Sequence, residues 1–241
     1  MKNIVFINML ILITGCLNCY SKDFLITDYG AVSGKLSTPG IQKAVDECYA
    51  CGGGKVLIPP GTFITGPVFL RSNTDIYLES GAVLKGSENI DDYKVNGDIH
   101  GIFYCEDETN ISISGHGTID ASGSHFYDSG KNHVADGFDR SVIRQKESYM
   151  PEGIFFSDGP IKRISMPGMT MVFYNCTRVS ITGITIKDTP IWATRFAYCD
   201  DILIDGITIQ NNVLIPNSDG IHCTASRNIR ISVPWLHILR G

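Results

Sequence analysis

Short runs of alternating apolar and polar residues fill most of this 241-residue chain, and Gly, Pro, Asn or Ser bounds each run. Because these runs are rich in β-branched residues, the pattern predicts one short strand after another. Residues 171–186 and 194–209 carry the same pattern twice with an offset of 23 residues, which places Phe173 on Phe196. A repeat of this length built from strands predicts a solenoid, in which each coil buries its apolar face against its neighbours.

Weaker copies of the pattern lie on both sides of this pair. Ile111 matches Val179 at an offset of 68 residues, close to three coils, and Ile229 follows Ile202 by 27 residues. Residues 121–168 lose the period, which predicts an irregular insertion on one side of the solenoid. Coils of 23–27 residues made of short strands favour an all-β fold, a right-handed single-stranded parallel β-helix with a long groove along its turns.

One segment near the N-terminus has the period of a helix instead. Thr38 is a suitable N-cap, Pro39 occupies the first helical position, and Gly52-Gly53-Gly54 ends the segment. Its apolar residues share one face: Ile41, Ala44, Val45 and Cys48. Since an open stack of strands exposes an apolar end that must be covered, we expect this segment to be an N-terminal capping α-helix.

The first residues have the composition of an export signal. Within residues 1–15 a basic start precedes an apolar run and small residues, and the run is too short to span a bilayer permanently. Ile13-Thr14-Gly15-Cys16 resembles a lipobox, which would place a lipid on Cys16; ordinary cleavage near Ser21 is the alternative. We expect an exported protein, either periplasmic, anchored to a membrane only through that lipid, or secreted, with residues 16–23 as a tether.

Charge and cysteine content limit the kinds of partner and bound group that we expect. The net charge is −5 and Lys and Arg form no block, which argues against a nucleic-acid partner. Cys176 and Cys199 fall on equivalent repeat positions and Cys223 follows 24 residues later, so we expect a buried ladder of thiols. Because no His residues cluster with these cysteines, we expect neither a metal site nor a cofactor. A monomer is expected, with a β-helix over residues 24–232 and a divergent tail over 233–241.

Several motifs resemble those of pectin-degrading β-helix proteins. Those of the opening coils are Asp28-Tyr29-Gly30-Ala31, Gly66-Pro67-Val68-Phe69-Leu70 and Leu78-Glu79-Ser80-Gly81-Ala82. Two later runs, Thr189-Pro190-Ile191-Trp192 and Pro216-Asn217-Ser218-Asp219-Gly220-Ile221, are similar to those of glycoside hydrolase family 28, the polygalacturonases and their relatives. The resemblance extends over about residues 24–232 and implies a pectin lyase-like solenoid.

This resemblance implies inverting hydrolysis of α-1,4-linked galacturonan, with a pectic polysaccharide or oligogalacturonide as the partner. Inversion needs one carboxylic acid and one carboxylate roughly 6.5–9.5 Å apart, on opposite sides of the scissile bond. The family takes its first aspartate from the Asn-Ser/Thr-Asp-Gly run, here Asp219, and two more from a Gly-Asp-Asp run one coil later. No acid follows Asp219 in this sequence. We therefore expect a truncated form with little or no activity.

Five residues make up the expected site. Asp219 is the catalytic candidate, although Asn-Ser-Asp-Gly is also ordinary turn chemistry. Asn217 would orient a hydroxyl or Asp219, and His222 occupies a position where relatives often carry Asp or Asn. Trp192 would stack on a sugar ring or fill a corner. Arg195 alternates outward between buried neighbours and is a candidate for binding a uronate carboxylate.

Two short runs have the same letters as catalytic motifs of this family but are not expected to be catalytic. Gly115-His116-Gly117 lies a hundred residues before Asp219 and is expected to be a structural turn. Asp200-Asp201 occupies the turn before a strand, where the matching Thr177-Arg178 carries no acid, so we expect a solvated corner.

Two other functions remain open. A pectate lyase-like β-helix would need clustered acids for Ca²⁺. A non-catalytic carbohydrate-binding β-helix would keep the groove without the second acid.

Overall fold

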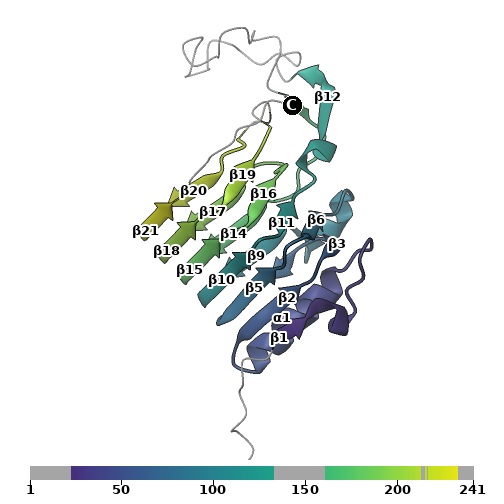
Figure 1. Cartoon of the computed structure of the whole chain (residues 1–241). Helices are drawn as coiled ribbons and strands as arrows, with labels where there is room; N and C mark the ends of the chain where they lie inside the picture. The colour runs from purple at the N-terminus through teal and green to yellow at the C-terminus, as the bar shows by residue number, and fades with distance from the viewer. Residues whose placement is uncertain (1–22, 133–160, 213–214, 216, 233–241) are drawn as a thin grey trace, which may run out of the picture.

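The computed structural model describes residues 23–132, 161–212, 215 and 217–232. The chain coils through three parallel sheets in turn, and adjacent coils pair along the axis (Figure 1). Sheet A has the order β1 (Asp23–Leu25), β2 (Gly54–Ile58), β5 (Thr74–Leu78), β10 (Thr109–Gly115), β15 (Thr177–Thr182), β18 (Asp200–Asp205) and β21 (Arg227–Ser232). This is the expected right-handed parallel β-helix.

The other two sheets have five strands each. Sheet B contains β3 (Gly61–Thr65), β6 (Ala82–Gly86), β11 (Thr118–Asp120), β16 (Thr185–Lys187) and β19 (Thr208–Gln210). Sheet C contains β4 (Val68–Phe69), β9 (Phe103–Glu106), β14 (Met171–Tyr174), β17 (Thr194–Ala197) and β20 (Ile221–Thr224).

Short excursions leave the three sheets. Two antiparallel pairs are β7 (Lys94–Val95) with β8 (Asp98–Ile99), and β12 (Tyr127–Asn132) with β13 (Ile161–Arg163). Three 3₁₀ helices are η1 (Ile26–Tyr29), η2 (Ile90–Tyr93) and η3 (Gly123–Phe126).

The register of neighbouring coils follows the repeat in part. Thr177 pairs with Asp200 and Ile202 with Ile229, as the offsets of 23 and 27 residues predict. Ile111 pairs directly with Val179, however, so the 68-residue offset is one coil and the prediction of nearly three was wrong. The insertion after β11 leaves the coil and returns to it before β14, and thus lengthens a single coil.

The core is a set of columns that run parallel to the axis. In each strand alternate side chains point inward, so equivalent residues of successive coils stack at the strand spacing of about 4.8 Å. Phe173 and Phe196 stack with ring centroids 5.0 Å apart and planes at 8°. On sheet A an isoleucine column contains Ile76, Ile113, Ile181, Ile204 and Ile231. Ile231, in the last described coil, is 50% exposed, whereas the others are buried.

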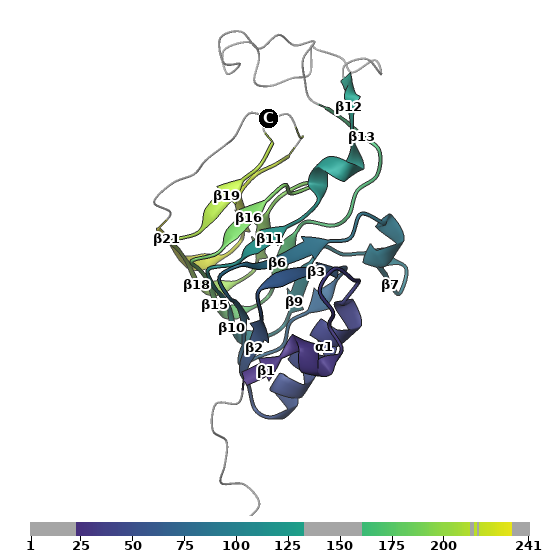
Figure 2. The ribbon, with the colours of Figure 1, turned by 45° about the vertical axis from the view of Figure 1, so that its right-hand side comes forward.

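The helix α1 (Thr38–Ala50) covers the first coil, next to β1 and β2 (Figure 2). The expected apolar face is buried. The N-cap is Ser37 and not Thr38, whose hydroxyl instead accepts a hydrogen bond from the Gly66 amide at 2.7 Å. Gln42 of the helix pairs with the edge of β4, since its amide donates to the Phe69 carbonyl and accepts from the Phe69 N–H. The helix thus provides hydrogen-bond partners for the backbone at the edge of β4 and also covers apolar residues.

The thiol ladder is shorter than the sequence predicts. Cys176 and Cys199 do stack, and the Cys176 N–H donates to the Cys199 sulfur at 3.4 Å. Cys223 pairs with Phe196 instead, because the coil between β17 and β20 is longer than the previous one. Among the described residues, the free cysteines include Cys48, Cys105, Cys176, Cys199 and Cys223.

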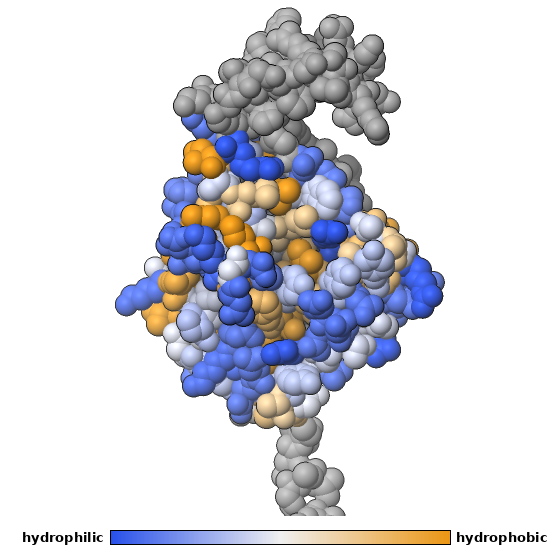
Figure 3. Space-filling model, turned by 180° about the vertical axis from the view of Figure 1, so that it is seen from behind, coloured by the Kyte–Doolittle hydropathy of each residue, from blue (hydrophilic) through white to orange (hydrophobic). Residues whose placement is uncertain are grey.

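Some predicted segments lie outside the described residues: the export signal with Cys16, most of the tether, much of the insertion and the tail 233–241. Within the described part, no helix has the length and hydropathy needed to cross a membrane. Seen from behind, hydrophilic residues cover most of the surface, and hydrophobic residues emerge between them in the upper half and the centre (Figure 3).

Candidate functional site

The Asn-Ser-Asp-Gly turn is held to sheet C by its backbone. The carbonyl of Asp219 accepts a hydrogen bond from the Ala193 N–H at 2.9 Å, and that of Gly220 accepts one from the Thr194 N–H at 3.1 Å. The turn is thereby fixed to the start of β17, while the Asp219 side chain stays 52% exposed. Asn217 is exposed and has a left-handed backbone with a φ of 57°. A fixed backbone with a solvent-accessible carboxylate suits a group that acts on a ligand.

Arg195 and His222 lie side by side on the outer face of sheet C. They pair across β17 and β20, and the flanking Thr194 and Phe196 are buried, so Arg195 points outward as predicted. His222 Nδ1 lies 3.7 Å from Asp219 Oδ2. His222 and Asp219 therefore form an ion pair when the imidazole is protonated.

Trp192 joins this group from the loop before β17. Its ring stacks on that of His222 with centroids 3.7 Å apart and planes at 13°. The Arg195 guanidinium carbon lies 5.8 Å from the Trp192 ring centroid, within the range of a cation–π contact. The structure thus brings together four of the five predicted site residues: Asp219, His222, Trp192 and Arg195.

The guanidinium of Arg195 has unused hydrogen-bonding capacity. Its Nε is buried and has no hydrogen-bond partner among the described residues, and its Nη1 faces the Met169 sulfur at 4.0 Å. Leaving a buried donor unpaired costs about 1–3 kcal/mol or more for a charged group. An arginine prefers a planar oxyanion that accepts two parallel N–H bonds. A carboxylate ligand would match this need.

Asn211, which sequence reasoning missed, joins the two loops of the site. Its Oδ1 accepts a hydrogen bond from the Thr189 N–H, and its Nδ2 donates to the Ser218 carbonyl, each at 3.2 Å. The side chain is 6% exposed. One buried amide therefore links the loop that carries Trp192 to the turn that carries Asp219. An asparagine after a strand looks like an ordinary turn residue, so this role could not be read from the sequence.

The insertion also contacts the site through the Trp192 loop. The Tyr127 hydroxyl donates to the Pro190 carbonyl and accepts from Arg163 Nε, the latter at 3.1 Å. Burial raises the pKa of Tyr127, and the hydrogen bond from Arg163 opposes that shift. The phenol therefore stays protonated and holds the Trp192 loop from the side. The insertion residues His133, Asp136, Asp139 and Arg140 lie outside the described part.

Both look-alike motifs lie away from this group. Gly115 ends β10 with a φ of 114°, and a Cβ there would lie 2.1 Å from the Leu78 carbonyl oxygen, so Gly115-His116-Gly117 is a structural turn. Asp200 and Asp201 belong to sheet A, where they form ion pairs with Arg227 and Arg230 of the next coil. Neither motif supplies a second acid beside Asp219.

A carboxylate from the coil after β20 is absent from the sequence, because residues 220–241 contain no Asp or Glu. Within the described ranges, no group of three or more His, Cys, Asp or Glu side chains could hold a metal ion.

Residues 159–238 match the model of glycosyl hydrolases family 28. Over these residues the chain is similar to that family. It is 25% identical over 235 residues to a probable polygalacturonase of Vitis vinifera, covering 89% of this chain and 42% of the relative. It is 25% identical over 239 residues to the exo-poly-alpha-D-galacturonosidase of Dickeya chrysanthemi, covering 86% of this chain and 39% of the relative. The chain thus spans well under half the length of these relatives.

The fold agrees with this similarity. The family 28 exopolygalacturonase of Yersinia enterocolitica superposes with a TM-score of 0.64 at 22% identity, over 87% of this chain and 42% of that one. At this identity the likeness shows the fold alone.

Proposed function

We propose that the outer face of sheet C around Asp219 binds a galacturonan, and that Asp219 is one carboxylate of an inverting pectin glycoside hydrolase. The kinship with polygalacturonases supports the substrate class. The turn that fixes the Asp219 backbone and leaves its carboxylate exposed supports the catalytic role.

The observation that carries this proposal is the unpartnered, buried Nε of Arg195. Each galacturonate unit has a planar carboxylate, which is the ligand that a guanidinium binds with two hydrogen bonds. Trp192, already in contact with Arg195 and His222, offers an aromatic surface beside it. The positive charge of Arg195 at this point therefore favours a uronic acid over a neutral sugar.

The chain by itself holds only part of an inverting site. One carboxylate cannot serve as acid and base on opposite faces of one bond, and no acid follows Asp219. We therefore propose that these 241 residues bind galacturonan but hydrolyse it weakly or not at all. A non-catalytic carbohydrate-binding β-helix, the second candidate, is favoured by the same missing acid.

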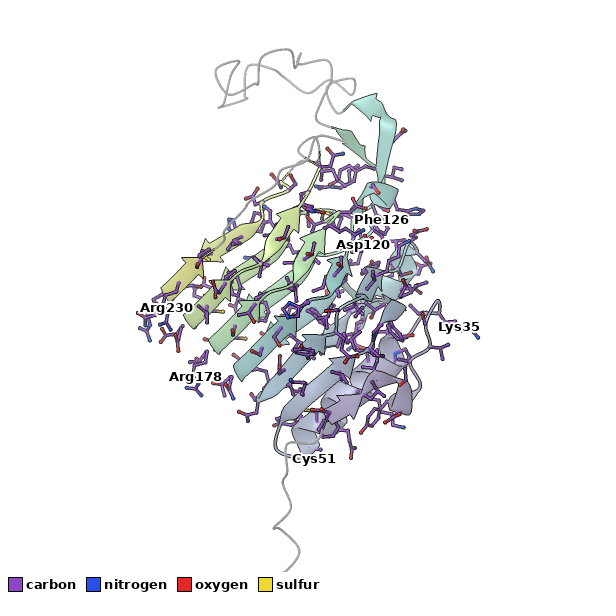
Figure 4. The ribbon with its side chains drawn as sticks, in the orientation of Figure 1. Lys35, Cys51, Asp120, Phe126, Arg178 and Arg230 are labelled. Carbon is purple, nitrogen blue, oxygen red and sulfur yellow. The ribbon has the colours of Figure 1, made fainter. Side chains whose placement is uncertain are left out.

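Calorimetric titration with trigalacturonate tests the binding site. We expect Arg195→Ala to weaken binding about tenfold or more, because a charge-assisted hydrogen bond is lost. Arg178→Ala is the matched control, since the exposed Arg178 belongs to β15 of sheet A, where its guanidinium donates to the Thr109 hydroxyl at 3.0 Å (Figure 4). Equal affinity in wild type and Arg195→Ala would remove the basis of the proposal.

A reducing-sugar assay on polygalacturonate separates the two candidates. The non-catalytic form predicts no release above background for wild type and for Asp219→Asn alike. Release that disappears in Asp219→Asn would show that the chain supplies a working acid–base pair.

We also propose that the protein is exported and carries a lipid on Cys16, on the basis of the N-terminal sequence alone. Mass spectrometry of the protein purified from a bacterial host would detect the acyl groups. A soluble product that starts near Ser21 would contradict lipidation but agree with export.

A further inference from the structure

A pair of exposed tyrosines lies at the corner where sheet C turns into sheet A. Tyr174 ends β14 and is 39% exposed, and Tyr198 follows β17 and is 57% exposed. Their rings meet edge to face with centroids 5.5 Å apart. Large aromatic side chains on a soluble surface gain little from folding, and clusters of them mark binding sites.

The backbone of Tyr198 adds a second cost. Its φ is 57°, in the left-handed region, where bulky residues are uncommon. The equivalent corner residues of other coils also have positive φ, and they are small or of the Asx type: Asp107, Asn175 and Ala225. Asn and Asp tolerate this conformation because of their short polar side chains. A strained, exposed tyrosine in this row points to a function, since such strain persists mainly where it serves one.

A third tyrosine and a carboxylate lie beside the pair. Glu106 is the register partner of Tyr174, and it accepts a hydrogen bond from the Tyr104 hydroxyl at 2.7 Å. Burial, followed by this hydrogen bond, raises the pKa of Tyr104 to about 12, so the phenol remains a donor at all physiological pH values. The carboxylate of Glu106 is thereby held in place, and Glu106 itself is exposed.

Charge decides which ligand fits. Glu106 begins the run Glu106-Asp107-Glu108. Arg71 lies 3.6 Å from Glu108, and the Asn175 amide donates to Asp107 at 2.6 Å. The carboxylate nearest the tyrosines is therefore not neutralised by these contacts. An anionic sugar would be repelled here, whereas hydroxyl groups of an uncharged sugar donate well to a carboxylate.

We propose that Tyr104, Tyr174, Tyr198 and Glu106, here named the tyrosine platform, bind an uncharged pyranose of an oligosaccharide. Tyrosine rings offer an apolar face to the C–H side of the sugar and a polar tip to its hydroxyls. The carboxylate of Glu106 accepts hydrogen bonds from two sugar hydroxyls.

The platform lies close to the galacturonan site without coinciding with it. Tyr174 and Ala197 are register partners, and Arg195 lies two residues before Ala197 on the same outward face of β17. Residues two apart on a strand are separated by roughly 7 Å. The same polymer could then present a uronate to Arg195 and a neutral sugar to the platform. That joint use rests on the proposed function, whereas neutral-sugar binding stands without it.

The decisive variant is Tyr198→Asn, titrated with β-1,4-galactotriose, β-1,4-xylotriose and trigalacturonate. We expect its melting temperature to equal or exceed that of wild type, because Asn suits the left-handed backbone. Its affinity for at least one neutral trisaccharide should fall about fivefold or more. Its affinity for trigalacturonate should not change. A structural role would instead lower the melting temperature and leave sugar affinity intact.

Two further variants bracket this result. Tyr174→Ala should weaken binding of the same neutral trisaccharide. Tyr77→Ala removes an aromatic ring from the outer face of sheet A and should leave that binding unchanged. Loss of trigalacturonate binding in Arg195→Ala, with neutral binding retained, would separate this site from the galacturonan site.

The proposal is overturned if wild type binds neither neutral trisaccharide at about 10 mM. Sedimentation that shows self-association abolished by Tyr198→Asn would also overturn it, since the tyrosines would then be an interface between copies of this chain.

Discussion

The outer faces of sheets A and C are built on the same coils but use their polar groups differently. On sheet A, polar side chains satisfy one another: Ser114 donates to Asp75 at 2.8 Å, and Arg227 and Arg230 pair with Asp200 and Asp201. On sheet C, the Nε of Arg195 has no partner among the described residues, and the Asp219 carboxylate is half exposed. Polar groups that are paired within a face have their hydrogen bonds supplied by the protein itself. The half-exposed Asp219 carboxylate is open to a ligand.

The two faces also differ in how far their aromatic side chains are exposed. The Lys55 ammonium covers the Tyr77 ring of sheet A at 4.2 Å, whereas Tyr174 and Tyr198 beside sheet C are open to solvent. Because the coil geometry is common to both sheets, the difference must come from side-chain choice at equivalent outward positions. Both proposed ligand sites therefore lie on or beside the outer face of sheet C.

The largest effect is expected inside the coil, where both faces depend on the same core. Phe173→Ala removes a ring stacked on Phe196 in a fully buried column, and we expect it to lower the free energy of unfolding by about 3–5 kcal/mol. Val172→Ala, its outward neighbour on β14, should cost less than about 1.5 kcal/mol. Chemical denaturation of both variants measures the difference. Similar losses would mean that the outward face of sheet C is as tightly packed as the core.

A smaller effect is expected from Asn211→Asp, which replaces the donor to the Ser218 carbonyl by an acceptor. We expect a loss of about 1–3 kcal/mol in unfolding free energy, because the part-buried Ser218 carbonyl loses its partner, and weaker binding of trigalacturonate.

The control for Asn211 is Asn110→Asp, an exposed amide that donates to Asn73 on the sheet A corner. It should change stability by no more than about 1 kcal/mol and leave binding intact. If Asn211→Asp destabilised the protein without affecting trigalacturonate, Asn211 would be structural only.

A modest, pH-dependent effect is expected at Asp75. Burial raises the pKa of this carboxyl, against the hydrogen bond from Ser114 and the charge of Lys55. The folded state therefore favours the protonated form, and stability falls as pH rises from the unfolded pKa of about 3.9 through the higher folded value. Asp75→Asn should raise the melting temperature near pH 7, and this gain should disappear at about pH 3. A gain that is independent of pH would contradict desolvation as its cause.

The smallest effect is expected at the exposed edge of sheet A. Arg230 and Asp201 form a pair whose side chains are 73% and 45% exposed, and Arg230 projects outward in Figure 4. Arg230→Ala should change the free energy of unfolding by less than about 1 kcal/mol and leave trigalacturonate binding unchanged. A clear loss of binding would place ligand contacts on sheet A and break the contrast between the faces.

Much of the fold could be predicted because a β-helix is written in local sequence. The α1 segment has a helical period and a Gly-rich stop, and the 23-residue repeat fixes the pairing of β15 with β18. The exact N-cap could not be chosen from the sequence, since Ser37 and Thr38 are both good caps. The choice depends on a tertiary contact, because the Thr38 hydroxyl accepts a hydrogen bond from the Gly66 amide. Offsets across insertions misled for a similar reason, because the length of an excursion does not reveal how many coils it contains.

The sequence by itself determined the strand period, the outward direction of Arg195 and the position of Asp219 in a turn next to sheet C. These follow from short-range alternation and from the constant rise between coils. Only the tertiary structure decided that Trp192 stacks on His222, that Asn211 links the two site loops, and that Arg195 keeps a buried donor unpaired. These features depend on the paths of two loops held by contacts between residues 7 to 63 positions apart, and no repeat encodes those paths.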